Sequence, residues 1–230
     1  MRGLALALLA ALAACAGSAP RAAEAPFALD SFRWRDDATP QGIVLATNAW
    51  GDLRVRTADR GGLVVSAMIQ RIGTTREELE IRIEETAEAV VVEVVPLVAR
   101  PRGRVDLTLM VPPGKRLEGT TRDGLAEIKY RGDVLARTRG GDILVETPAH
   151  ASARSETGSI TAKLSGEAWR QPLSFTSGSG DVTLWVPEDA SPELRVESVH
   201  GDVRVIPYRP RARPSPPQPI ADTRSYQGTR

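Results

Sequence analysis

The segment RGGDILVET, residues 139–147, contains the step that decides the fold: a glycine, an aspartate and then an aliphatic residue. The same step, with Asp or Ser in the middle, recurs along the chain, which indicates a structural repeat. Its copies are Gly51-Asp52-Leu53, Gly141-Asp142-Ile143, Gly158-Ser159-Ile160, Gly180-Asp181-Val182 and Gly201-Asp202-Val203, and Gly124 heads a less regular copy.

Apolar residues stand at constant distances from each of these glycines. The positions seven and five residues before the glycine, and two and four residues after it, are apolar or Gly, whereas the positions between them are mostly polar. This two-residue spacing is that of a β-strand with one buried face. The column two residues after the glycine, for example, reads Leu53, Ala126, Ile143, Ile160, Val182 and Val203.

The spacing between copies predicts an all-β fold, a parallel β-solenoid of short two-strand coils. From Gly124 onward, the successive repeat glycines are 17, 17, 22 and 21 residues apart, which is room for two short strands and two turns. Equivalent residues of such coils stack about 4.8 Å apart in one shared interior. An antiparallel β-sandwich or meander remains the alternative.

The six glycines are predicted to be structural turn residues. We expect each to adopt a positive φ, which a residue without a Cβ adopts freely, and the following Asp or Ser to bond the turn backbone. Short hydrogen-bonding residues stand three positions before each glycine, and we expect them to satisfy turn amides and to stack as a polar ladder. They are Asn48, Thr121, Thr138, Ser155, Ser177 and Ser198.

Residues 60–113 interrupt the repeat. Their alternating patterns, such as Val105, Leu107, Leu109 and Val111, predict longer strands. We expect an additional larger sheet, antiparallel or mixed, that covers one end of the stack. Apolar residues before the first coil would pad the same end, and the proline-rich C-terminus would guard the other. The padding residues are Phe27, Leu29, Phe32 and Trp34.

The N-terminus has the features of an export signal. Arg2 precedes an apolar run from Leu4 to Ala14, about half the length that spans a bilayer, which is typical of a signal peptide. The run ends in Leu12-Ala13-Ala14-Cys15, which resembles the lipobox of bacterial lipoproteins. That resemblance implies cleavage before Cys15 and lipidation of its sulfur. Ordinary secretion, with cleavage further on, is the alternative.

These patterns divide the chain into four parts. Residues 1–14 are a signal peptide, and residues 15–40 hold the lipidated Cys15, a tether and an N-terminal cap. Residues 41–206 form the β-repeat domain, and residues 207–230 are a Pro/Arg-rich tail that we expect to be extended or disordered. The expected location is therefore a membrane surface facing the exterior or periplasm, the outer membrane in a Gram-negative cell.

The repeat, together with the strand end Val111-Pro112-Pro113-Gly114, resembles a broad bacterial family of adhesin-like proteins of unknown function. The resemblance covers about residues 41–206. It implies β-strand repeats in a solenoid-like stack and frequent export or membrane attachment. It implies no catalytic residues.

The sequence shows no signature of an enzyme. Thirty basic residues balance 29 acidic ones, so no basic stripe suggests a nucleic-acid partner. Neither His150 nor His200 has neighbours at zinc-ligand spacing, and we expect no metal, cofactor or catalytic residue. Trp185 is the one speculative binding residue, because its position points away from the apolar columns. Packing beneath the 187–193 loop is its alternative role.

Two functions remain open from the sequence alone. The first is a non-enzymatic cell-envelope lipoprotein that acts as a β-repeat scaffold or adhesin-like binding module. Its partners would be the membrane, through the N-terminal lipid, and an envelope protein or cell-wall component. The second is a glycan-binding or glycan-active β-helix, for which a groove holding Trp185 beside paired carboxylates would be the distinguishing feature.

Overall fold

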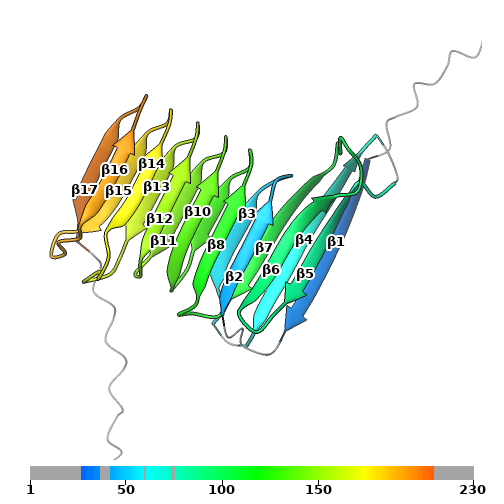
Figure 1. Ribbon diagram of the computed structural model, residues 1–230, viewed down its shortest axis with the longest axis horizontal. Helices are drawn as coiled ribbons and strands as arrows, with labels where there is room; N and C mark the ends of the chain where they lie inside the picture. Colours follow the sequence, from blue (N-terminus) through cyan, green and yellow to red (C-terminus); the bar gives the residue numbers. More distant parts are fainter. Residues whose placement is uncertain (1–26, 37–41, 60, 74–75, 210–230) are drawn as a thin grey trace, which may run out of the picture.

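The computed structural model describes residues 27–36, 42–59, 61–73 and 76–209 of the 230-residue chain. In that part of the chain seventeen β-strands form two sheets that face each other across one core (Figure 1). No helix in the described segments is long and apolar enough to cross a membrane. Cys15 and the predicted signal peptide lie outside the described residues.

The first layer, sheet A, has nine strands. In order across the sheet they are β1 (Phe27–Asp36), β4 (Leu63–Ile72), β7 (Arg104–Val111), β3 (Leu53–Thr57), β9 (Ala126–Lys129), β11 (Ile143–Thr147), β13 (Ile160–Leu164), β15 (Val182–Pro187) and β17 (Val203–Tyr208). From β7 to β17 every neighbouring pair is parallel, whereas β4 runs antiparallel to both β1 and β7.

The second layer, sheet B, has eight strands. In order they are β16 (Leu194–Ser198), β14 (Leu173–Ser177), β12 (Ala151–Ser155), β10 (Asp133–Thr138), β8 (Arg116–Thr121), β2 (Ile43–Asn48), β6 (Ala89–Pro96) and β5 (Leu79–Glu85). All pairs are parallel except β5 with β6. Each coil supplies one strand to each sheet, so the predicted parallel solenoid is confirmed and the antiparallel alternative is not found.

Strand register follows the sequence columns. Ile143 pairs with Ile160, Ile160 with Val182, and Val182 with Val203. The side chains of Ile143, Ile160 and Val182 are at most 1% exposed, in one core that runs the length of the stack. Val203, expected in the same interior, is 45% exposed. It has the predicted register, but its coil is the last one described, so no described coil covers it.

Residues 60–113 do not form a separate sheet. Their strands are divided between the two layers: β4 and β7 extend sheet A, and β5 and β6 extend sheet B. Strands β6 and β7 are themselves a coil in register with β2 and β3, since Val92 pairs with Ala46 and Leu107 with Leu53. Only β1, β4 and β5 pair in antiparallel fashion with every neighbour that they have, and they close one end of the stack as expected (Figure 1).

The padding at that end is partly as predicted. Phe32 and Trp34 on β1 pack against the core, but Leu29 is 51% exposed because it lies on the opposite face of the same strand. The side chain of Phe27 lies outside the described part.

The turn glycines are required for a different reason from the one predicted. Among the described residues only Gly61, Gly73 and Gly114 have a positive φ, and none of these is a repeat glycine. The repeat glycines instead touch the backbone of the preceding coil. A Cβ on Gly141 would lie 1.9 Å from the Gly124 carbonyl oxygen, and one on Gly158 would lie 2.0 Å from that of Gly141. Close coil stacking therefore excludes a side chain at each of the six repeat glycines.

The predicted polar ladder is present and connects successive coils. The hydroxyls of Ser177 and Ser198 donate to the carbonyls of Gly158 and Gly180 in the coil before, at 2.9 and 2.8 Å. The aspartates that follow the glycines act in the other direction. Asp142 Oδ1 accepts the Ser159 N–H of the next coil at 2.8 Å. The ladder hydroxyls and the aspartates thus satisfy backbone hydrogen-bonding groups at the bends.

Candidate functional site

Because the inner columns are occupied by packing, a binding surface has to come from the outward side chains or the ends of the stack. Two hollows and one bare end have the features of candidate sites. The first hollow surrounds Trp185 on sheet A, and the second surrounds Arg71 at the end closed by β1. The bare end is the coil of β16 and β17, which no other described coil covers.

Trp185 lies on the outer face of β15 in a row that crosses sheet A. The parallel register places Glu146 beside Lys163, Lys163 beside Trp185, and Trp185 beside Ile206. Because neighbouring strands lie about 4.8 Å apart, these side chains form a continuous line. Trp185 is 39% exposed, so part of its side chain is accessible to solvent.

We call the hollow along this line the Trp185 groove. Its volume is 460 Å³. It is lined by Lys129, Leu144, Val145, Glu146, Thr161, Lys163, Trp185 and Tyr208. These residues come from five parallel strands of sheet A, so their spacing is set by the rigid ladder beneath them.

Tyr208 and Lys163 shape the groove through mutual contacts. The Lys163 ammonium lies 5.5 Å from the centre of the Tyr208 ring and 3.7 Å from Glu146 Oε1. Tyr208 donates a hydrogen bond to the Leu164 carbonyl at 2.8 Å. Burial, and then the nearby Glu146 carboxylate, raise the pKa of Tyr208 above its usual value. The groove therefore offers two aromatic rings, one lysine and one carboxylate that are held in place.

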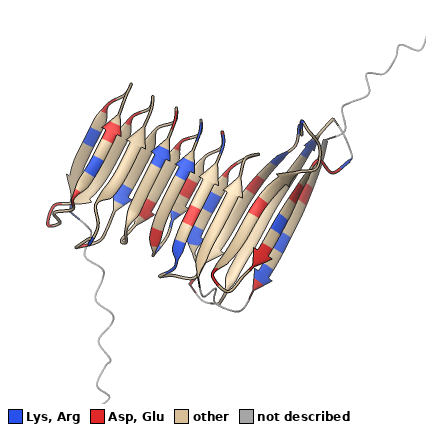
Figure 2. Cartoon of the chain, in the orientation of Figure 1, with Lys and Arg blue, Asp and Glu red and all other residues tan. Residues whose placement is uncertain are grey.

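The charges around the groove do not form a field of one sign. Acidic and basic residues are interspersed along the stack (Figure 2). Within the groove Glu146 is the only carboxylate among the lining residues, and it already contacts Lys163. This is a surface for stacking and hydrogen bonding, and it lacks the paired carboxylates of a glycan-cleaving site.

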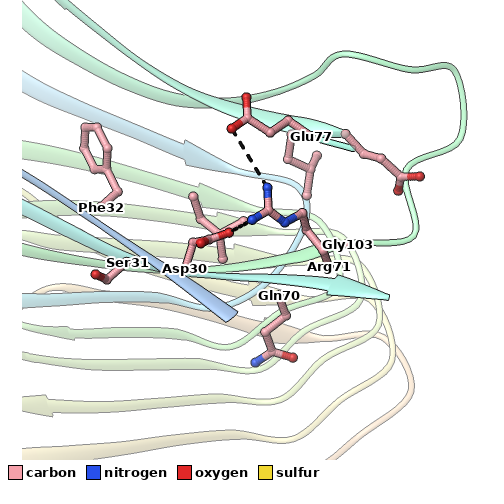
Figure 3. A pocket seen from close by; sticks show the side chains of 10 residues that line it. Asp30, Ser31, Phe32, Gln70, Arg71, Glu77 and Gly103 are labelled. Carbon is pink, nitrogen blue, oxygen red and sulfur yellow. Dashed lines mark hydrogen bonds and ion pairs between the residues drawn. The ribbon is translucent and has the colours of Figure 1, made fainter. Parts of the chain in front are cut away.

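The second hollow, of 280 Å³, lies at the end of the stack that β1 closes. Figure 3 shows Arg71 of β4 between Asp30 of β1 and Glu77, with an ion pair to each. Phe32, Ile69 and Leu79 form its apolar wall. Arg71 already has two carboxylate partners, so this cluster links the edge strands and offers little charge to a ligand.

The arginine cluster was not predicted from the sequence. It forms only because β1 pairs with β4 over a long sequence separation, and no local motif signals that pairing. Sequence reasoning also missed the place of Tyr208 in the Trp185 groove. The sequence pattern places Tyr208 in the tail of residues 207–230, but it is the last residue of β17.

The two histidines lie apart, and the ring of each is within hydrogen-bonding distance of a backbone carbonyl. The His150 ring is 3.1 Å from the Pro172 carbonyl, and the His200 ring is 3.2 Å from the Gly178 carbonyl. In the described segments, no three His, Cys, Asp or Glu side chains come close enough to hold a metal ion.

The chain is similar to a known β-repeat family. Residues 125–213 match a family described as Toastrack DUF4097, a domain family of unknown function. This match confirms the resemblance expected for the repeat region. A search of curated proteins finds no match.

Three solved bacterial structures are also similar over most of the chain. A "putative cell adhesion protein" from Clostridium sporogenes has 9% identity and a TM-score of 0.44, and the match covers 80% of this chain and all of that one. A "putative adhesin" from Bacteroides fragilis has 12% identity and a TM-score of 0.37, with 79% and 97% covered. One from Parabacteroides distasonis has 8% identity and a TM-score of 0.35, with 78% and 97% covered.

Proposed function

We propose that this protein is a non-enzymatic, lipid-anchored envelope protein whose β-repeat stack is an adhesin-like binding module, and that the Trp185 groove is its binding surface. The observation that carries the proposal is the exposed Trp185 ring beside Tyr208 on the outer face of a rigid parallel sheet. Exposed aromatic rings on a fixed scaffold contribute much contact area at little cost in conformational entropy.

The shape of the groove favours an extended ligand. Its outward row repeats once per strand, so a chain lying across the strands meets Lys129, Glu146, Lys163 and Trp185 in turn. Alternating charges followed by an aromatic ring suit a polypeptide segment with interspersed charged and apolar side chains. We therefore place a protein partner of the cell envelope first.

The anchor is proposed from the sequence. Lipidation of Cys15 would hold the chain at a membrane, and residues 16–26, small and proline-containing, would act as a tether. More than one acyl chain on the N-terminal cysteine gives firm attachment, since a single chain holds only marginally. Cys15→Ala is expected to abolish metabolic labelling with palmitate, and unchanged labelling would remove the anchor from the proposal.

A glycan ligand is the second candidate. The aromatic pair Trp185 and Tyr208 favours it, because flat rings stack on sugar faces. The groove has one carboxylate where a glycoside hydrolase needs two, so binding without cleavage is the form of this alternative that the groove supports.

Site-specific photocrosslinking in intact envelopes tests the proposal. A photoreactive amino acid at Thr161, inside the groove, is compared with one at Ser152, on the outer face of sheet B. We expect a discrete protein adduct from position 161 only. Trp185→Ala should weaken this adduct about 30-fold if the ring is a binding hot spot, whereas Thr183→Ala, on the same face of β15, should not. Equal adducts from both positions would refute the proposal.

A glycan array separates the two ligands. Binding of the purified chain to a defined polysaccharide, lost in Trp185→Ala and kept in Thr183→Ala, would replace the protein partner with a glycan. Absence of glycan binding together with a protein adduct at position 161 supports the first candidate.

A further inference from the structure

A third hollow lies on the outer face of sheet B, where strands β8, β10 and β12 lead into their glycine bends. Its volume is 270 Å³. It is lined in part by Thr120 of β8, Arg137 of β10 and Arg154 of β12, and by Arg139 and Glu156, which follow β10 and β12. We call it the Arg137 hollow. It is on the opposite sheet from the Trp185 groove, so the two surfaces are independent of each other.

The parallel register places two arginines directly side by side in this hollow. Arg137 pairs with Arg154, while Thr120 flanks Arg137 and Thr176 flanks Arg154 on the next strands out. Both arginines are exposed and occupy equivalent positions of their strands, so their guanidinium groups leave the sheet on the same side. Like charges directly opposite each other on neighbouring strands destabilise a sheet. Holding the coils together therefore does not explain this pair.

Neither arginine of this pair has a carboxylate partner among the described residues. In this they differ from every other Arg and Lys side chain within the described strands of the parallel coils, such as Arg116, which lies 2.7 Å from Glu118. The nearby carboxylates already have partners, since Glu118 pairs with Arg116, and Glu156 lies 3.7 Å from Arg139. The two adjacent guanidinium groups therefore have N–H donors available to a ligand.

The charge of the hollow favours a dianion. Three arginines against one glutamate leave it with two positive charges in excess. A phosphate monoester carries a charge of about −1.5 to −2 at pH 7 and three acceptor oxygens, so it can accept N–H groups from two guanidiniums at once. Strands about 4.8 Å apart bring the two side chains close enough to share one such group, and the Thr120 hydroxyl adds a neutral donor. A sulfate ester or a carboxylate has a single charge and would leave one guanidinium uncompensated.

We propose that Arg137 and Arg154 bind a phosphate monoester group, with one guanidinium from each of two adjacent coils on the same phosphate. The bound anion takes the place of a carboxylate partner and turns the repulsion between the two arginines into a bridge between β10 and β12. Arginine suits this role better than lysine, because its planar fork donates two parallel N–H groups to neighbouring oxygens. A phosphorylated sugar of an envelope glycan or lipid and free phosphate share this chemistry, and titration of both separates them.

Isothermal titration calorimetry of the purified chain tests the ligand class. The probes are inorganic phosphate and three sugars that differ in their charged group: glucose-6-phosphate, glucose-6-sulfate and glucuronate. We expect glucose-6-phosphate to bind at least about tenfold more tightly than the other two sugars, because it makes one more charge-assisted contact. Tighter binding of glucose-6-phosphate than of inorganic phosphate assigns the site to a phosphorylated sugar, and the reverse order or equal binding assigns it to the free ion. If the three sugars bind equally, or none binds at about 10 mM, where even a millimolar site would be mostly filled, the proposal is wrong.

The ionisation of the ligand gives a second signature. A phosphate monoester takes up a proton below its second pKa of about 6, so the affinity for glucose-6-phosphate should fall about tenfold from about pH 7.5 to about pH 5. The charged side chains that face the two arginines are Glu118, Arg139 and Glu156, and β14 presents none on this face. Glucose-6-sulfate keeps its single charge over this range, so its affinity reports any change in these protein groups and should stay constant. An equal affinity for glucose-6-phosphate at both pH values would contradict a dianion site.

Single substitutions test whether this pair is the site. Arg137→Gln and Arg154→Gln should each weaken glucose-6-phosphate binding at least about tenfold. Arg116→Gln is the matched control and should bind as the wild type does, because Arg116 lies on sheet B beside Asp133, four residues along β10 from Arg137. In phosphate-free buffer Arg154→Gln should melt no lower than the wild type, since it removes a like-charge contact, yet it should lose the rise in Tm that glucose-6-phosphate gives the wild type. Equal losses of binding in all three variants would show general charge attraction and overturn the proposal.

Discussion

The most direct test of the stacking rule is to add one methyl group at two adjacent glycines. In Gly141→Ala the new Cβ would lie 1.9 Å from the Gly124 carbonyl oxygen, whereas such a contact is not closer than 3.0 Å in real structures. The two coils must therefore separate locally by 3.0 − 1.9 = 1.1 Å. In Gly140→Ala the nearest atom is Oδ1 of the exposed Asp123, at 3.0 Å, and that side chain can rotate away.

The separation has a definite energetic cost. Three hydrogen bonds cross between these coils beside Gly141: Arg139 N–H and Gly140 N–H to the Arg122 carbonyl, and Ala126 N–H to the Asp142 carbonyl. They measure 3.0, 2.7 and 3.0 Å. A further 1.1 Å takes them to about 4 Å, beyond hydrogen-bonding distance. At about 1 kcal/mol each, their loss costs about 3 kcal/mol.

Thermal and urea unfolding of the two variants, followed by circular dichroism, measures this cost. We expect Gly141→Ala to lower Tm by about 6–12 °C, because 1 kcal/mol shifts Tm by about 2–4 °C at this chain length. Gly140→Ala should stay within about 0.5 kcal/mol of the wild type, since neither glycine has a positive φ. If the two variants unfold together, close approach does not explain the glycine column, and the stacking rule fails.

Three further predictions address the interior. Val182→Asp places a charge in the core, where Val182 is 0% exposed, and should unfold the stack, while Thr183→Asp on the outer face should be nearly neutral in the same melt. Asn48→Ala removes the amide that donates to the Asp52 and Val105 carbonyls and accepts Trp50 N–H; urea titration should show a loss of about 2–4 kcal/mol. Burial raises the pKa of Tyr130 to about 12, so the unfolded chain ionises first, and the wild type should lose stability from pH 10 to 12. Tyr130→Phe should reduce that slope in unfolding midpoints measured across this range, and Tyr208, whose pKa is also raised, should account for part of what remains.

The regular part of the fold is predictable from local spacing. The apolar columns and turn glycines determine strand position, inward face and register together, because a parallel stack repeats one environment in every coil. The same rule allowed the hydroxyl ladder to be predicted from Ser155, Ser177 and Ser198. The reason for the glycines was misjudged, since a turn glycine suggests a positive φ when only the chain itself is considered. The contact that excludes a Cβ comes from another coil.

The coil of β6 and β7 is not predicted from the sequence because it has no repeat glycine at its bend. Its connection, residues 97–103, is longer than the glycine bend of the other coils, and Val105 takes the place beside Gly51 where a repeat glycine would lie. Chain order hides it further: β6 and β7 come after β2 and β3 in sequence but precede them in the stack. Recognising this coil required the pairing of Val92 with Ala46, which no local pattern shows.

The location of the candidate site follows from which positions the repeat leaves free. Every inward column is committed to packing, and the bends are committed to glycines and ladder hydroxyls, so outward residues are the ones that can vary without cost to the stack. Most outward residues near the middle are taken up by mutual ion pairs, as Arg56 is with Glu127 at 2.6 Å. Toward β17 the row changes character after Lys163, where Trp185 and Ile206 replace charges. We propose that this exposed aromatic and apolar stretch, which differs from the charged residues beside it on the same sheet, is used for binding.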